Sequence, residues 1–323
     1  MFNDIFLVAM EAVCYASFLA HGAQDMSFFA KSDSSVVTVY DIAIQILLCS
    51  ALAKYDLDLV AEEDDSDLYQ EVFRALTQVN SSSALQHIAS FFQTHNLIPS
   101  ALPSHPRRTI SSSERLSIVI DPIDGTRGFI NRRSFSIVVC ALYKHAPVFS
   151  IIADPRALEV FYCTNLPEYP HRALATRFAM AAQPAETMSS FRNSLNLRVA
   201  YSAEPEHSGT LLEQFLTQLA KHFPITRMPL DGQCKYAYLG VRRVDLFIRL
   251  PSTRFTEKIW DHAAGLHMAS FCRVTDAFGQ SFTSESPPAY GVIAATVSKI
   301  HHISLAIITD LFKTSNFSYL CTP

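Results

Sequence analysis

Four segments in the first half of the chain repeat apolar residues at the spacing of an α-helix. They are residues 5–23, 39–53, 66–78 and 83–95, and the last two patterns are the weaker ones. Short continuous apolar runs predict buried strands at 57–61, 117–120, 135–143 and 147–154. The Ser- and Pro-rich segment 96–114 predicts a surface loop. This half of the chain therefore favours helices packed against an antiparallel sheet.

The second half of the chain alternates strand and helix patterns. Strands are expected at 197–201 and 245–250 and in two further short runs, and helices at 209–222, 261–271 and 301–313. Such alternation favours a layered α/β arrangement. We therefore predict an N-terminal α+β domain over residues 1–160 and a C-terminal α/β domain over residues 161–323.

The composition is that of an ordinary globular protein of 323 residues, with 49% hydrophobic and 17% charged residues. A net charge of −4 disfavours binding of a nucleic acid polymer, which needs many cations on one face. It permits binding of a small polyanion where metal ions supply positive charge. Asp4 and Glu11 interrupt the apolar N-terminus, and no uncharged stretch reaches the roughly 20 residues of a membrane span. Seven scattered cysteines without a C-x-x-C pair predict reduced thiols, so we expect a cytoplasmic protein that does not bind a membrane.

One acidic turn carries the clearest chemistry. Asp121 and Asp124 lie three residues apart in Asp-Pro-Ile-Asp-Gly-Thr, directly after the strand predicted at 117–120. Carboxylates that converge at a strand end suit Mg²⁺, which prefers oxygen ligands and keeps positions open for water and phosphate oxygens. Gly125 and Thr126 would open the next turn, where backbone N–H groups can hold a phosphate. An isolated D-x-x-D is more often a solvated turn, so the assignment depends on the other motifs.

The segment from Asp121 to Phe129 resembles the DPIDGT signature of the inositol monophosphatase-like superfamily. Three more segments match that superfamily in the same order along the chain. Residues 37–41 with Gln45 resemble V-T-x-x-D-x-x-x-Q, residues 61–64 resemble G-E-E-D, and residues 257–265 resemble the W-D-x-A-A-G element. Four matches in the same order along more than 200 residues are not plausibly a coincidence. The resemblance implies a layered αβαβα sandwich of the sugar phosphatase type and a phosphatase activity.

Finer similarities favour the 3'(2'),5'-bisphosphate nucleotidases within that superfamily. Residues 127–129 are similar to their K-G-F, residues 202–208 to S-V-E-x-G-H-S, and residues 230–236 to L-D-S-Q-x-K-Y. This implies removal of the 3'-phosphate from 3'-phosphoadenosine 5'-phosphate, which leaves AMP. Gly232 replaces the usual Ser, and residues 270–273 replace an E-A-G-G element. An inositol polyphosphate or another metabolite phosphate therefore remains an alternative substrate, and a non-catalytic regulatory relative is a third possibility.

The resemblance also implies roles for individual residues. Two or three Mg²⁺ ions would be held by Glu62, Asp121, Asp124, Asp261 and the backbone carbonyl of Ile123. Asp41 and Thr126, together with Glu62, would orient and deprotonate a metal-activated water for in-line attack on phosphorus. The substrate would contact a set of polar residues, namely Gly125, Thr126, His207, Ser208, Lys235, Arg249 and Lys258. Asp261 is expected at the start of a helix, and Li⁺ is expected to inhibit. The partner would be a small phosphorylated substrate, and the oligomeric state stays open.

Overall fold

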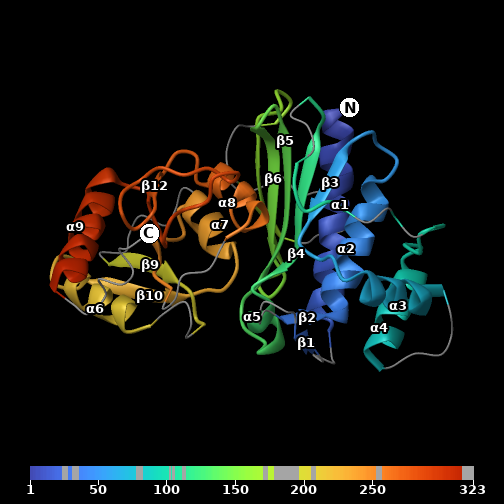
Figure 1. Cartoon of the computed structure of the whole chain (residues 1–323), viewed down its shortest axis with the longest axis horizontal. Coiled ribbons are helices and arrows are strands. Elements are labelled where there is room, and N and C mark those ends of the chain that lie inside the picture. Colours follow the sequence, from blue (N-terminus) through green and yellow to red (C-terminus); the bar gives the residue numbers. More distant parts are fainter. Residues whose placement is uncertain are drawn as a thin grey trace.

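The protein forms two β-sheets separated and flanked by helices (Figure 1). The computed structural model describes residues 1–23, 28–30, 36–77, 83–101, 103, 106–110, 114–169, 174–177, 196–204, 209–251 and 257–314. The described elements of the first half are α1 (Phe2–His21), β1 (Phe28–Ala30), β2 (Val36–Thr38), α2 (Val39–Leu52), β3 (Asp58–Ala61), α3 (Ser66–Thr77), α4 (Ser83–Thr94), β4 (Ser117–Asp124), α5 (Thr126–Ile130), β5 (Ser136–Tyr143), β6 (Ala146–Asp154), β7 (Glu159–Thr164) and β8 (Leu174–Arg177).

The described elements of the second half are β9 (Leu197–Tyr201), α6 (Thr210–Leu219), β10 (Ile225–Pro229), α7 (Cys234–Gly240), β11 (Leu246–Arg249), the 3₁₀ turn η2 (Ile259–Asp261), α8 (Ala263–Met268), β12 (Arg273–Thr275), β13 (Val292–Ala295) and α9 (Ser298–Thr314). The first sheet has the strand order β3-β4-β5-β6-β7-β8, and the second has the order β10-β9-β11-β13-β12. In the first sheet only β3 and β4 run parallel. A two-stranded β1–β2 hairpin stands apart from both sheets.

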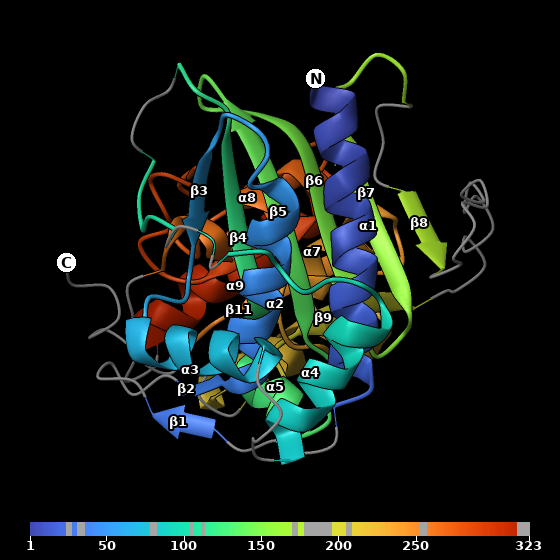
Figure 2. The ribbon, with the colours of Figure 1, turned by 90° about the vertical axis from the view of Figure 1, so that its right-hand side faces the viewer.

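The layers follow from the alternation of side chains along the strands. In β4, Ile118 and Ile120 belong to the core shared with α1 and α2, whereas Val119 faces α7 and α8. In β11, Phe247 belongs to the core beside Tyr236 of α7, whereas Ile248 faces α6 and α9. Each sheet therefore buries both of its faces. Figures 1 and 2 show the resulting stack, and the αβαβα sandwich expected from the sequence is confirmed.

Helix α1 has the length and apolar composition of a membrane-spanning segment. One face of it is nevertheless part of the first core, because Ile5, Phe6, Ala9 and Val13 are buried against the six-stranded sheet and its neighbours. The ring of Phe6 also packs edge-on against Phe149 of β6, with 5.3 Å between ring centroids. The apolar pattern at the N-terminus thus specifies a packed core helix.

Most of the predicted elements occur, and the exceptions are informative. The helix predicted at 261–271 is shorter than expected, because η2 ends at Asp261 and α8 spans only Ala263–Met268. The first sheet continues to Arg177, past the expected domain boundary at residue 160. Helices α7 and α8 pack between the two sheets, so the division into two domains stays a prediction.

Candidate active site

Four carboxylates meet where elements of the two halves end. Glu62 directly follows β3, and the parallel register of β3 with β4 pairs Ala61 with Ile120, so Glu62 and Asp121 follow paired positions. Between Asp121 and Asp124 the pairing of β4 with β5 shifts. Such an irregularity lets two residues three apart serve one side of a strand, which regular alternation would prevent. Asp261 reaches the same region from η2 of the second half.

The four carboxylates repel one another, and Asp121 is the most deeply buried of them. Asp121 is only 1% exposed, and its Oδ1 has no hydrogen-bond partner among the described residues. Burial first, and then the charges of Glu62, Asp124 and Asp261, raise the pKa of Asp121 well above its usual range. Burial likewise raises the pKa of Asp261 to about 8. The described residues therefore leave the negative charge of Asp121 uncompensated.

Hydrogen bonds and two cations oppose this repulsion in part. The carboxylate of Asp261 accepts the backbone N–H of Lys258 at 2.5 Å. Asp124 Oδ2 accepts a long hydrogen bond of 3.4 Å from the hydroxyl of Ser136. Burial raises the pKa of Asp124, while the charges of Lys235 and Arg249 lower it and leave a smaller net rise. These contacts hold Asp124 and Asp261 in defined places at the edge of the cluster.

The donor set fits a hard divalent cation in charge and in atom type. All four side chains offer oxygen, and the Ile123 carbonyl, which accepts the Thr126 hydroxyl at 3.1 Å, adds a fifth oxygen nearby. In the described part of the chain, no three His, Cys, Asp or Glu side chains are already arranged around one ion. The unpartnered Oδ1 of Asp121 is the clearest sign that the cluster is built for a cation.

Asp41 and Thr126 form the predicted pair beside this cluster. Asp41 occupies the first turn of α2, where its Oδ2 accepts the backbone N–H of Thr38 at 2.8 Å and the Thr38 hydroxyl at 2.5 Å. This capping box fixes the carboxylate and directs Oδ1 toward Thr126, whose hydroxyl lies 3.3 Å away. One turn later, the Gln45 side chain binds the backbone N–H and carbonyl of Glu63 at 3.0 and 2.8 Å. Helix α2 therefore positions both the Thr126 hydroxyl and the segment that carries Glu62.

The residues predicted to bind substrate have different environments. Gly125 caps α5 with a φ of 89°, and a β-carbon there would lie 3.0 Å from the backbone N of Gly232. Arg249 is paired with the buried Glu257 at 2.8 Å, and Lys258 is exposed. His207 and Ser208 lie outside the described residues. The contacts of these residues with a substrate remain predictions.

Lys235 is buried, and its ammonium holds the turn before α7. It donates hydrogen bonds to the carbonyls of Leu230 and Gly232 at 3.1 and 2.6 Å. Burial lowers the pKa of Lys235, while the charges of Asp124 and Asp231 oppose that change. The geometry supports a role in fixing this turn and in compensating Asp124, besides any contact with substrate.

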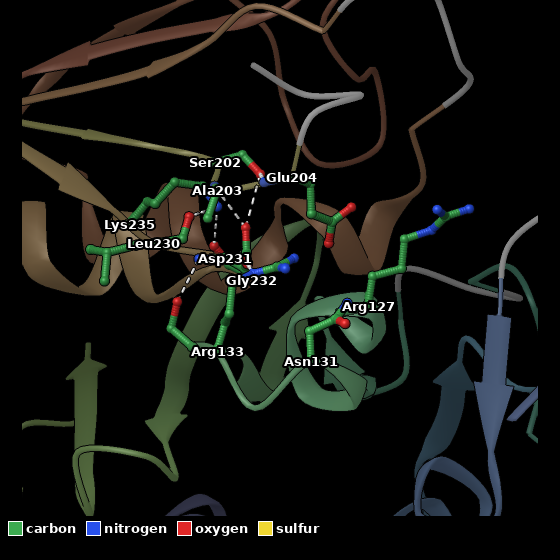
Figure 3. A network of polar contacts seen from close by, with 11 residues as sticks. Arg127, Asn131, Arg133, Ser202, Ala203, Glu204, Leu230, Asp231, Gly232 and Lys235 are labelled. Carbon is green, nitrogen blue, oxygen red and sulfur yellow. Dashed lines mark hydrogen bonds and ion pairs between the residues drawn. The ribbon is translucent and has the colours of Figure 1, made fainter. Parts of the chain in front are cut away.

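The buried carboxylate of Asp231 is the centre of a hydrogen-bond network (Figure 3). The sequence patterns did not predict this structural role. Asp231 Oδ2 accepts a hydrogen bond from Arg133 Nε at 2.9 Å. Its Oδ1 accepts from the Ser202 hydroxyl at 3.0 Å and the Ala203 backbone N–H at 2.9 Å. The backbone N–H of Asp231 donates to the Ser134 hydroxyl at 2.7 Å. Asp231 therefore joins the loop before β5 to the end of β9, and its place within the L-D-G-Q segment was the available signal.

Glu204 extends this network toward α5 (Figure 3). Its backbone N–H donates to the Ser202 hydroxyl at 3.2 Å, and its side chain is only 7% exposed. Burial first, and then the charge of Asp231, raise the pKa of Glu204, while Lys235, Arg133 and the exposed Arg127 oppose the rise. The acidic group is thus held between the two halves close to the turn that Lys235 fixes.

Residues of the W-D segment form another buried network. Glu257 pairs with Arg249 and with the ring Nε2 of His262, whose Nδ1 lies 3.1 Å from the hydroxyl of Tyr236. The side chains of Glu257, His262 and Tyr236 are all buried. The ring of Tyr236 packs so closely on Gly265 that a β-carbon there would lie 2.3 Å from the ring. Only glycine fits that position, so this network fixes the W-D segment on α7.

Comparisons with known proteins show which family this sequence matches. The model of the inositol monophosphatase family matches residues 26–310. A 3'(2'),5'-bisphosphate nucleotidase from Schizosaccharomyces pombe is 26% identical over 286 residues, covering 77% of this chain and 76% of the relative. A protein of the same name from Oryza sativa is 28% identical over 303 residues, covering 84% of this chain and 83% of its own. The solved inositol monophosphatase of Thermotoga maritima covers 97% of this chain and 99% of its own with a TM-score of 0.62 and 17% identity, which shows a shared fold.

Proposed function

The chain belongs to the inositol monophosphatase family, and we propose that it is a Mg²⁺-dependent phosphomonoesterase that removes the 3'-phosphate of 3'-phosphoadenosine 5'-phosphate. The relatives named 3'(2'),5'-bisphosphate nucleotidase support a phosphatase of that type. The observation that carries the metal requirement is the buried Asp121 carboxylate, which faces three other carboxylates and has an unpartnered oxygen. Such a cluster is stable at neutral pH only when a cation or protons neutralise it.

Glu62, Asp121, Asp124, Asp261 and the Ile123 carbonyl would hold the metal ions, two or three in number. Mg²⁺, when bound, supplies positive charge to the phosphate oxygens and makes water a better nucleophile near neutral pH. Asp124 also interacts electrostatically with the other half, because the positive charges of Lys235 and Arg249 stabilise its ionised form. These two side-chain cations therefore help to fix the position of Asp124 relative to the second sheet.

The Asp41–Thr126 pair would orient the attacking water and receive its proton. The Thr126 hydroxyl has two acceptors within reach, Asp41 Oδ1 at 3.3 Å and the Ile123 carbonyl at 3.1 Å. When it donates to Asp41, its own lone pairs are free to accept a hydrogen bond from water. Asp41 Oδ2 is held by both donors of Thr38, so Oδ1 is the atom on which a proton would arrive. Burial of Asp41 at 1% exposure keeps bulk water from competing with this transfer.

The test is release of inorganic phosphate by purified, metal-stripped protein after Mg²⁺ is added back. The substrate panel is 3'-phosphoadenosine 5'-phosphate, 3'-AMP, an inositol monophosphate and an inositol polyphosphate. The proposal expects Mg²⁺-dependent hydrolysis of the bisphosphate with the highest kcat/KM, inhibition by Li⁺, and no activity in excess EDTA. Equal activity with verified absence of metal would contradict the mechanism.

Gly232 favours one alternative substrate class. It has a φ of 65°, and a β-carbon there would lie 2.4 Å from both the Asp124 carbonyl and the Ser136 hydroxyl. This turn therefore has no room for a side chain at position 232, where the nucleotidase motif that it resembles has Ser, because Ser136 occupies that space. A protein that ignores the bisphosphate and hydrolyses an inositol polyphosphate or another metabolite phosphate would establish this alternative.

A further inference from the structure

Residues 106–110 run beside β3, the edge strand of the first sheet. The backbone N–H of Arg107 donates to the Leu59 carbonyl at 2.8 Å, and its carbonyl accepts from the Ala61 N–H at 3.0 Å. Arg107 thereby forms a parallel bridge with Val60. This pairing fixes the backbone of the segment immediately before Glu62, although the composition of 96–114 predicted only a surface loop.

The next side chain, Arg108, contacts both halves of the site. Its guanidinium donates to the Glu62 carbonyl at 2.5 Å and forms an ion pair with Asp64 at 2.9 Å. It also lies over the indole ring of Trp260, with 4.7 Å between the guanidinium carbon and the ring centroid. Trp260 is only 4% exposed and immediately precedes Asp261. One side chain therefore touches the residue that carries one proposed metal ligand and the neighbour of another.

The geometry points to Arg108 as a positioning residue that sets the separation between the Glu62 turn and the Trp260–Asp261 turn. This inference rests on the proposed function, because it assumes that Glu62 and Asp261 serve one metal centre. The two turns come from opposite halves of the chain, and each lies at the end of a short element, β3 and η2. Gln45 fixes the Glu62–Glu63 segment within the first half, and the contacts of Glu257 fix the W-D segment within the second. Arg108 joins the two segments directly, and this contact sets the separation between them.

The chemistry of arginine suits this task better than that of lysine. A planar guanidinium can stack on the indole face while its edge donates to the Glu62 carbonyl and to Asp64. A lysine ammonium would keep the charge but could not make the stacked and forked contacts together. The Arg108 and Asp64 side chains are 42% and 59% exposed, so their ion pair adds little to global stability. An effect of Arg108 on metal affinity would therefore reflect local geometry.

The experiment compares Arg108→Ala and Arg108→Lys with Arg107→Ala as the matched control. Arg107 has the same charge and is its neighbour, but its side chain makes no hydrogen bond or ion pair with the residues that the structure describes, and its backbone bridge does not depend on the side chain. Mg²⁺ affinity of the metal-free protein is measured by isothermal titration calorimetry, and urea unfolding is measured in EDTA. Trp260 is the only tryptophan in the sequence, so its quenching by acrylamide reports directly on the stacked contact.

We expect the Mg²⁺ dissociation constant to rise about tenfold in Arg108→Ala and several-fold in Arg108→Lys, as for other residues that orient metal ligands. Trp260 quenching should increase in Arg108→Ala, while the urea midpoint and the Arg107→Ala affinity stay at the wild-type values. Wild-type Mg²⁺ affinity in Arg108→Ala, with Mg²⁺ binding intact in the unmodified protein, would overturn the inference and leave the proposed function standing. Absence of Mg²⁺ binding by the unmodified protein would overturn both.

Discussion

Asp121 and Asp231 are equally buried, each 1% exposed, but their surroundings are opposite. Asp231 accepts hydrogen bonds from a guanidinium, a hydroxyl and a backbone N–H, all at 2.9–3.0 Å. Asp121 faces carboxylates of Glu62, Asp124 and Asp261, and one of its oxygens has no partner among the described residues. Burying a charge is unfavourable unless something compensates it. The chain compensates Asp231 itself, and Asp231 joins the two halves. It leaves Asp121 uncompensated, and we propose that a cation neutralises Asp121 and that this residue serves the chemistry.

The largest expected effect is on catalysis by Asp121→Asn. Loss of one ligand charge should lower kcat by at least about 10³-fold, which corresponds to about 4 kcal/mol. Stability of the metal-free protein at pH 7.5 should stay the same or increase by about 1 kcal/mol, because like-charge repulsion is relieved. Phosphate release and urea unfolding in EDTA measure the two quantities. A variant that keeps more than a tenth of kcat would remove Asp121 from the metal site.

Asp231→Asn should show the reverse pattern. An asparagine presents an amide NH₂ to at least one of three donors, so unfolding free energy should fall by about 3 kcal/mol. Mg²⁺ affinity per folded molecule should change far less than in Asp121→Asn. Urea unfolding in EDTA and calorimetric titration provide the comparison. If Asp231→Asn is as stable as the wild type, the distinction between the two carboxylates fails.

Thr126→Ala tests the proton-transfer pair with a smaller expected effect. Without the hydroxyl, Asp41 loses its link to the attacking water, and kcat should fall by about 10²-fold. Thr126→Ser keeps the hydroxyl and is the matched control, with kcat expected within a few-fold of the wild type. Because Thr126 is only partly buried, KM for Mg²⁺ and the urea midpoint should remain close to their original values. A large loss in Thr126→Ser as well would indicate a packing role for the methyl group.

The smallest expected effect is the pH dependence of the metal-free protein. The pKa of Asp261 is raised to about 8 in the folded state, above its value near 4 in the unfolded chain. Its contribution to stability is therefore fully present below about pH 4 and is lost as pH rises through about 8. Stabilisation by Mg²⁺ should consequently increase between pH 6 and pH 8.5. Thermal unfolding with EDTA or Mg²⁺ measures both trends, and Asp261→Asn should flatten the EDTA profile; an unchanged profile would contradict the assignment.

The sequence predicted those elements that have a regular apolar pattern. Helix α1 and strand β4 are of this kind, because each has a long apolar run that matches its buried face. Strand β10 was missed, since it is a partly exposed edge strand that ends in Pro229. Helix α7 was missed because it is short and buried on nearly all sides, which removes the helical period. Helix α8 is shorter than the predicted 261–271, because His262, with a φ of −134°, separates it from the 3₁₀ turn in which Asp261 accepts the Lys258 N–H.

The site shows the same division. The motifs pointed to the acidic cluster and to the Asp41–Thr126 pair through the family resemblance, although Asp41 and Thr126 are 85 residues apart. The supporting contacts depend on tertiary structure, since Arg133 and Asp231 are 98 residues apart and Arg108 reaches Trp260 across the two halves. No local pattern marks such pairs. The motifs therefore indicated the groups that we propose to be reactive, and the structure was needed to show which contacts position them.

The count of protons released on Mg²⁺ binding tests the central claim most directly. If the cluster is left uncompensated by the chain, its carboxylates are partly protonated in the metal-free protein at pH 7, and binding must displace those protons. Calorimetric titrations in two buffers of different ionisation enthalpy give the number. We predict release of about one proton or more per protein molecule, falling in Asp121→Asn and unchanged in Asp231→Asn. Tight Mg²⁺ binding without proton release, or equal release in Asp121→Asn and the wild type, would contradict the account.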